Sequence, residues 1–167
     1  MIQASWSTAG VLTTFTYDNL GHLLSLSKKE ANGDNAITKY FRYDNNGNLI
    51  YGTDGNGSAT DYTYDENNRL IATSSGTKTT SYTYDKNGNQ LSMTDWLGNT
   101  SHTVYDALGR VIEKRDAYGI AIQKLTYDDN SRQISSKDAL GHITSFAYDK
   151  NNRLIQTIAP DGYTITQ

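Results

Sequence analysis

Large apolar and small polar residues alternate along seven short stretches of this chain, and each stretch ends in a Tyr-Asp pair. The residue two positions before the tyrosine is apolar in six of the seven copies, and the residue between them is most often threonine. A period of two is that of a β-strand, which aromatic and β-branched residues favour. The pattern therefore predicts an all-β protein. The tyrosines of the pairs are Tyr17, Tyr43, Tyr64, Tyr84, Tyr105, Tyr127 and Tyr148.

The Tyr-Asp pairs recur at a nearly constant spacing, with successive steps of 26, 21, 20, 21, 22 and 21 residues. A fixed period of this length is typical of repeat proteins. We interpret residues 1–167 as a single repeat array. The long first step contains residues 28–35, which we interpret as a lengthened surface connection, because surface loops tolerate insertions at little cost.

The residues that follow each tyrosine predict a tight turn. The aspartate can accept backbone N–H bonds, and three positions later a glycine or asparagine suits the left-handed backbone of a type I turn with a bulge. Ser131 takes this place in the sixth copy, and we expect that turn to be strained or of another type. The predicted turn residues are Asp18, Gly21, Asp44, Gly47, Asp65, Asn68, Asp85, Gly88, Asp106, Gly109, Asp128, Asp149 and Asn152.

A second turn pattern lies about ten residues after the first in most copies. It reads Asp-x-x-Gly at residues 54–57, 95–98, 116–119 and 138–141. One strand fits between successive turns, so the sequence predicts an antiparallel β-meander of about seven repeats with two strands each. The family resemblance described below implies that this meander forms a twisted or spiralling sheet.

The position seven residues after each tyrosine is apolar in every copy, whereas the position before it admits glutamine. We therefore expect the tyrosines and the later residue to form the structural core, with the face that carries the later residue the more strictly buried. These later residues are Leu24, Ile50, Ile71, Leu91, Ile112, Ile134 and Ile155.

The composition limits the classes of function. Only 36% of the 167 residues are hydrophobic, so we expect stability to come from strand stacking. A net charge of -3 gives no bias toward nucleic acid, and no apolar run approaches the ~18 residues that span a bilayer. Without cysteine there is no disulfide and no thiolate metal site. We expect no cofactor, no nucleic-acid partner and no membrane insertion.

The polar residues do not predict a catalytic or metal site. Nearly every aspartate occupies a predicted turn, and the three histidines, His22, His102 and His142, are best interpreted as exposed turn residues. Residues 54–65 resemble a calcium loop faintly, but Ala59 stands where such a loop needs glycine. We therefore expect a protein that is not an enzyme and binds no metal.

Aromatic residues leave a second interpretation open, a carbohydrate-binding or cell-surface-binding module. Trp96 lies inside a predicted turn and is the best single candidate for an exposed contact, because aromatic faces stack on sugars. The favoured interpretation is that most of these rings form an aromatic ladder along the sheet.

The stretch Tyr105-Asp106-Ala107-Leu108-Gly109-Arg110-Val111-Ile112 resembles the YD repeat of the RHS family, which includes bacterial RHS proteins, toxin-complex shell proteins and animal teneurins. Residues 64–70 and 148–154 match with asparagine for glycine. The arginine position holds His22, Asn48 or Asn89 in three copies, so Arg110→Asn is expected to be nearly silent, whereas Ile112→Asp is expected to unfold its repeat.

The resemblance implies a β-strip that spirals into a hollow shell, which in bacterial toxins encloses a toxin domain. It implies a structural role in a secreted or cell-surface bacterial parent. The implied partners are further YD repeats and, in the parent protein, a toxin cargo. Apart from the resemblance, open sheet edges and the apolar face favour self-association, and the aromatic residues leave a glycan as an alternative partner. The chain has no Asp-Pro motif, which the family links to self-cleavage. We expect a fragment of a longer array, with no signal peptide in this chain.

Overall fold

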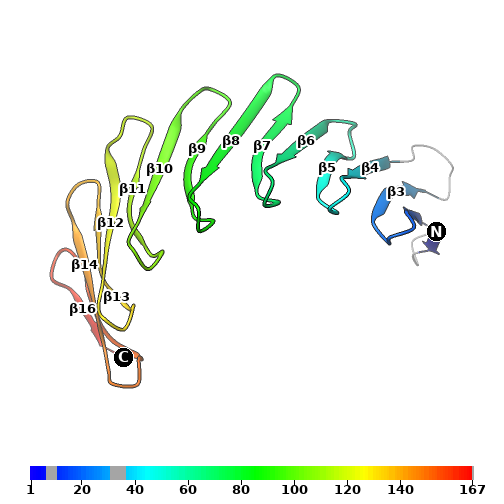
Figure 1. The fold of residues 1–167 in the computed structure, drawn as a ribbon. Coiled ribbons are helices and arrows are strands. Elements are labelled where there is room, and N and C mark those ends of the chain that lie inside the picture. The colour runs from blue at the N-terminus through cyan, green and yellow to red at the C-terminus, as the bar shows by residue number, and fades with distance from the viewer. Residues whose placement is uncertain (7–10, 31–36, 167) are drawn as a thin grey trace. The chain divides into compact units, whose positions relative to one another are not determined.

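The computed structural model describes residues 1–6, 11–30 and 37–166, and this part of the chain contains sixteen strands and no helix (Figure 1). The strands are β1 (Ile2–Trp6), β2 (Leu12–Tyr17), β3 (Leu23–Lys29), β4 (Ile37–Tyr43), β5 (Leu49–Thr53), β6 (Ala59–Tyr64), β7 (Leu70–Ser75), β8 (Lys78–Tyr84), β9 (Gln90–Thr94), β10 (Thr100–Tyr105), β11 (Val111–Arg115), β12 (Ala121–Tyr127), β13 (Gln133–Asp138), β14 (Ile143–Tyr148), β15 (Leu154–Ile158) and β16 (Thr164–Thr166).

The strands follow one another in the sheet in the order of the sequence, from β1 to β16. Neighbouring strands run antiparallel, as in β2 with β3 and β12 with β13. Two strands fall in each repeat, one before and one after the Tyr-Asp turn. The predicted all-β antiparallel meander is therefore confirmed.

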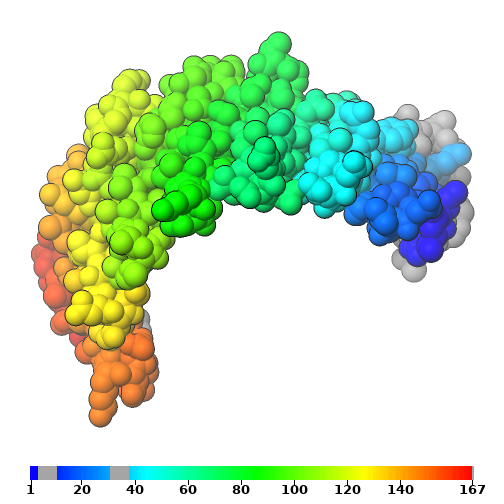
Figure 2. All heavy atoms as spheres, in the orientation of Figure 1, coloured from blue at the N-terminus to red at the C-terminus, as the bar shows by residue number. Residues whose placement is uncertain are grey.

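The chain divides into two units, Met1–Ser81 and Tyr82–Gln167, with the boundary inside β8. In each unit the strands form a single layer (Figure 1), and Figure 2 shows no second layer over the face in view. The lengthened connection expected at residues 28–35 falls partly outside the described residues, because β3 continues through Lys29 and residues 31–36 are not described.

One face of the sheet carries pairs of hydrogen-bonded hydroxyl groups. In three copies a threonine before the Tyr-Asp pair meets a serine of the next strand, as in Thr16 with Ser25, where the two side-chain oxygens are 2.6 Å apart. Thr126 and Ser135 make the same contact at 2.6 Å. Because adjacent strand residues point to opposite faces, the tyrosines lie on the other face.

The expected core does not exist within the described residues, where no hydrophobic side chain is buried. Four of the seven strictly apolar positions are exposed, namely Leu24, Leu91, Ile134 and Ile155, each with 37% to 39% of its surface accessible. The residue before each of them is half-buried, even where it is Gln90 or Gln133. The expectation that the later residue is the more strictly buried one is therefore wrong.

A β-bulge lies at this apolar position. Thr16 pairs with Ser25 and Tyr17 pairs with Leu23, so Leu24 is an extra residue without a partner in the ladder. The same shift precedes Tyr43, Tyr64, Tyr105, Tyr127 and Tyr148. A bulge bends the strand, increases its twist and redirects a side chain. The invariant apolar position is thus a bulge residue of a one-layer sheet.

Candidate functional site: the Tyr-Asp turns and the junctions between repeats

The turn after Tyr105 shows how the aspartate organises each repeat. The backbone N–H of Asp106 donates to the carbonyl of Arg110 at 2.9 Å, and the N–H of Gly109 donates to the Asp106 carbonyl at 3.0 Å. Asp106 Oδ1 accepts the N–H groups of Leu108 at 2.9 Å and Arg110 at 3.0 Å, while Oδ2 accepts Arg110 Nε at 2.7 Å. One carboxylate therefore holds both sides of the turn.

The fourth residue of every Tyr-Asp turn has a left-handed backbone. Gly109 has φ 77°, and Asn68 and Asn152 have φ 60° and 63°. Ser131 has φ 63°, and its N–H donates to the Asp128 carbonyl at 3.0 Å as in the other copies. The expectation of another turn type at Ser131 is therefore wrong, although a serine at positive φ is strained.

Hydrogen bonds lower the pKa of the turn carboxylates. The backbone N–H of Arg110 is the largest cause that lowers the pKa of Asp106, and the arginine side chain adds to it. In the second copy the Asn48 side-chain amide is the main cause that lowers the pKa of Asp44. These groups are therefore ionised at neutral pH, where they accept hydrogen bonds and cannot act as general acids.

Tyrosines of four Tyr-Asp pairs complete the hydrogen bonding between neighbouring repeats. The ladder between β11 and β12 starts at Glu113, which leaves the beginning of β11 without strand pairing on that side. The Tyr127 hydroxyl donates to the Val111 carbonyl there at 2.8 Å. The hydroxyls of Tyr64, Tyr105 and Tyr148 bind the carbonyls of Leu49, Gln90 and Gln133 in the same way at 3.0 Å.

The residue after the turn glycine reaches from its own turn to the next repeat. Arg110 covers the Tyr127 ring, with its guanidinium carbon 4.7 Å from the ring centre, and its Nη1 donates to the Asp128 carbonyl at 3.3 Å and to Ser131 Oγ at 3.1 Å. Arg132 makes the equivalent contacts with Tyr148 and the turn that follows it. The arginine therefore joins two turns that are one repeat apart.

Other residues at the arginine position make shorter versions of this link. The His22 ring stacks on Tyr43 with 4.8 Å between ring centres, and its Nδ1 lies 2.8 Å from Asp18 Oδ2. Asn48 Nδ2 donates to its own Asp44 at 2.9 Å and to Asn68 Oδ1 at 2.7 Å. His22 is therefore half-buried rather than exposed as expected. Sequence reasoning missed these junctions because they join residues about twenty positions apart.

Two family models match the stretches that contain these turns. The Teneurin YD-shell model matches residues 50–118, and the RHS Repeat model matches residues 127–164, so together they cover more than half of the chain. The chain belongs to the RHS/YD-repeat family. No curated protein sequence matches it significantly.

Solved structures share the fold of this YD-repeat chain at low sequence identity. One is TcdB2-TccC3-Cdc42, with a TM-score of 0.76 and 19% sequence identity over 97% of this chain and 10% of that chain. Another is TcdB2-TccC3 without its hypervariable C-terminal region, with a TM-score of 0.77 and 19% identity over 92% of this chain and 9% of that chain. A third is the Photorhabdus luminescens Tc holotoxin pore, with a TM-score of 0.77 and 20% identity over 97% of this chain and 10% of that chain. The YD-repeat chain thus spans about a tenth of the length of the structures it matches.

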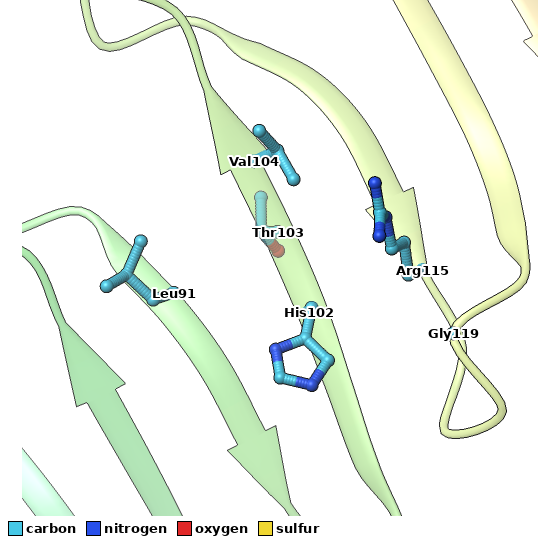
Figure 3. Close-up of a pocket in the computed structure, with 6 residues that line it drawn as sticks. All are labelled: Leu91, His102, Thr103, Val104, Arg115 and Gly119. Atoms are coloured by element: carbon cyan, nitrogen blue, oxygen red, sulfur yellow. The ribbon is translucent and has the colours of Figure 1, made fainter.

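An open concavity of about 440 Å³ in the second unit of the YD-repeat chain is lined by residues of β9 to β11 and the turn after them (Figure 3). His102 pairs with Arg115 across β10 and β11, and the Arg115 side chain is bound to Glu113. Thr103 is next to His102 on β10, so the two side chains point to opposite faces. Their arrangement does not bring a nucleophile and a base together.

The acidic residues of the faint calcium loop serve as turn residues in the YD-repeat chain. Asp54 Oδ1 accepts the N–H groups of Asn56 at 2.8 Å and Ser58 at 2.9 Å, and Asp65 has its own turn. Within the described ranges, no three His, Cys, Asp or Glu side chains form a group that could hold a metal ion. No helix of the described part is long and apolar enough to cross a membrane.

Trp96 lies in the turn between β9 and β10 and is 53% exposed. The polar groups beside it are engaged in the turn, since Asn99 Nδ2 donates to Asp95 Oδ2 at 2.9 Å. These two side chains therefore stabilise the turn. Sequence reasoning named Trp96 alone and missed that the third turn residue is also apolar and exposed in five turns, at Leu20, Leu97, Leu108, Tyr118 and Leu140.

Proposed function

We propose that this chain is a structural segment of the wall of a larger shell and performs no catalysis. The observation that carries the proposal is a one-layer sheet in which no described hydrophobic side chain is buried. Such a sheet leaves both faces partly open to a further surface. A wall that separates an interior from solvent needs two accessible faces, whereas a globular domain buries one of them.

The junctions suit a wall because they link only neighbouring repeats. The Tyr127 hydroxyl and the Arg110 side chain both act between one repeat and the next. Stability in such an array is the sum of local repeat and junction contributions. The same contacts can therefore continue through further YD repeats, which we propose as the main partners of this segment.

We propose a toxin domain as the cargo of the parent protein, and a secreted or cell-surface location for that parent. Both proposals rest on family membership and on the likeness to a segment of Tc toxin structures. We assign no glycan to this chain, because the polar groups beside Trp96 are engaged in their turn.

Limited proteolysis of the parent protein tests the wall. The cargo is expected to survive a protease that digests the same domain when it is expressed alone. Tyr105→Ala combined with Tyr127→Ala removes two junction bonds and should make the cargo cleavable, whereas Tyr118→Phe, a change in an exposed turn, should leave it protected. Equal digestion of the cargo in the unaltered parent and alone would refute encapsulation.

A further inference from the structure

Three Asn-Gly pairs occupy equivalent places in turns of the described chain, at Asn46-Gly47, Asn56-Gly57 and Asn87-Gly88. A fourth, Asn32-Gly33, lies outside the described residues. Asparagine before glycine is prone to deamidation, because glycine has no side chain that shields its backbone nitrogen. The three turns share a sequence pattern but differ in their contacts, so they should differ in reactivity.

Deamidation needs only water. The backbone nitrogen of the glycine loses its proton to base and forms a bond with Cγ of the asparagine, and the side-chain nitrogen leaves as ammonia. Water then opens the five-membered succinimide. Cleavage at one carbonyl gives aspartate, and cleavage at the other gives isoaspartate, in which the main chain runs through the former side chain. Hydrogen bonds that hold the carboxamide or the glycine N–H slow this step.

The Asn46-Gly47 turn holds both reacting groups. Asn46 Nδ2 donates to Asn68 Oδ1 of the next repeat at 3.0 Å, and the Gly47 N–H donates to the Asp44 carbonyl at 3.1 Å. The His22 ring covers Gly47, since its Nε2 lies 3.3 Å from where a Cβ would stand. This pair is therefore restrained by two neighbouring repeats.

The Asn56-Gly57 turn lacks the side-chain hydrogen bond and the histidine cover, and it keeps the glycine N–H bond at the longest distance of the three turns. The Asn56 carboxamide makes no hydrogen bond to any described residue, and the Gly57 N–H is 3.3 Å from the Asp54 carbonyl. Nothing lies within 4 Å of where a Gly57 Cβ would stand. Position 58 is serine, so the side-chain amide that ties Asn48 to Asp44 has no counterpart here. This turn is the least restrained of the three.

The Asn87-Gly88 turn is intermediate. The Asn87 carboxamide makes no hydrogen bond within the described ranges, but Asn89 Nδ2 donates to Asp85 Oδ2 at 2.8 Å and fixes the turn. The Gly88 N–H lies 3.2 Å from the Asp85 carbonyl. The contacts therefore predict that Asn56 deamidates fastest, Asn87 at an intermediate rate and Asn46 slowest.

We propose that Asn56-Gly57 is a spontaneous deamidation site whose isoaspartate product opens the β5–β6 hairpin. Isoaspartate adds one methylene to the main chain within this turn. Asp54 Oδ1 then cannot accept the N–H groups of both Asn56 and Ser58, which are 2.8 and 2.9 Å away. The new carboxylate also makes the net charge of -3 more negative by one unit. The hairpin therefore loses its turn as the protein ages.

Peptide mapping of the aged chain tests the proposal. The protein is incubated in mildly alkaline buffer at physiological temperature, and tandem mass spectrometry assigns deamidation to each asparagine over time. Asn56 is expected to react about fivefold faster than Asn46, the factor that one net hydrogen bond corresponds to, with Asn87 between them. In concentrated urea the three rates should converge. Equal rates in the folded chain, or a faster Asn46, would overturn the proposal.

Two variants test whether the contacts, rather than the local Asn-Gly sequence, control deamidation and its effect on the hairpin. Asn68→Gly removes the acceptor for Asn46 and suits the positive φ of that position, so it should speed reaction at Asn46 and leave Asn56 unchanged. An unchanged Asn46 rate would contradict the protective contact. Asn56→Gln should keep the amides of β5 and β6 protected from hydrogen exchange during ageing, whereas the unaltered chain should lose that protection as isoaspartate accumulates.

Discussion

The Tyr127 hydroxyl tests the claim that tyrosines join neighbouring repeats. It donates to the Val111 carbonyl at 2.8 Å, at a place where the ladder between β11 and β12 has ended. Tyr127→Phe removes that bond and keeps the ring beneath Arg110. One net hydrogen bond contributes about 1 kcal/mol. We therefore expect the free energy of unfolding to fall by about 1 kcal/mol, or a melting temperature lower by about 2–4 °C for a chain of this size.

Urea unfolding followed by circular dichroism measures this change, with Tyr118→Phe as the matched control. Tyr118 is 87% exposed in the turn between β11 and β12, and its hydroxyl makes no hydrogen bond to a described residue, so its variant should match the unaltered chain. Tyr127→Leu should cost more than Tyr127→Phe, because it also removes the ring that Arg110 covers. Equal stability of Tyr127→Phe and Tyr118→Phe would refute the reasoning.

Four further changes follow from the same contacts. Because Arg110 makes junction contacts, Arg110→Asn should not be nearly silent, as expected from the sequence, but should cost about 0.5–1 kcal/mol of stability through loss of the cover on Tyr127 and the bond to Ser131. Arg153→Asn, at a 75% exposed side chain, should cost less, and equal urea midpoints for the two variants would contradict the junction. Leu154→Asp should lower the free energy of unfolding by about 1–3 kcal/mol, because Leu154 is half-buried opposite Tyr148. Ile155→Asp should lower it less, because Ile155 is an exposed bulge residue. The reverse order would support the original core assignment. Ser131→Asn should stabilise the chain by a few tenths to about 1 kcal/mol, since asparagine tolerates positive φ. The new side chain can still accept the hydrogen bond from Arg110, as Asn152 accepts one from Arg132. A lower melting temperature would count against the strain at Ser131. The lowered pKa of Asp106 contributes stability that is complete above the ordinary pKa of 3.8 and is lost as the pH falls through the lower pKa of the folded state. In Asp106→Asn, the free energy of unfolding should therefore depend less on pH in the acid range.

The repeat, the strands and the turns could all be predicted from the amino-acid sequence. A Tyr-Asp turn is a local structure, because the Asp106 carboxylate binds only groups between Leu108 and Arg110. Alternation and spacing then predict antiparallel strands between successive turns. Seven copies of the same local pattern allowed the meander to be predicted without any knowledge of contacts between repeats.

The register of the strands, the burial of side chains and the junctions between repeats depend on contacts between strands, and the sequence pattern did not predict them. The invariant apolar position was expected in a core, but the pairing of Tyr17 with Leu23 makes Leu24 a bulge residue, and a bulge is a property of two strands together. Burial depends on what covers a face, and one layer of strands covers neither. The bond from Tyr127 to Val111 joins residues 16 positions apart, which only the packing of one repeat against the next brings together.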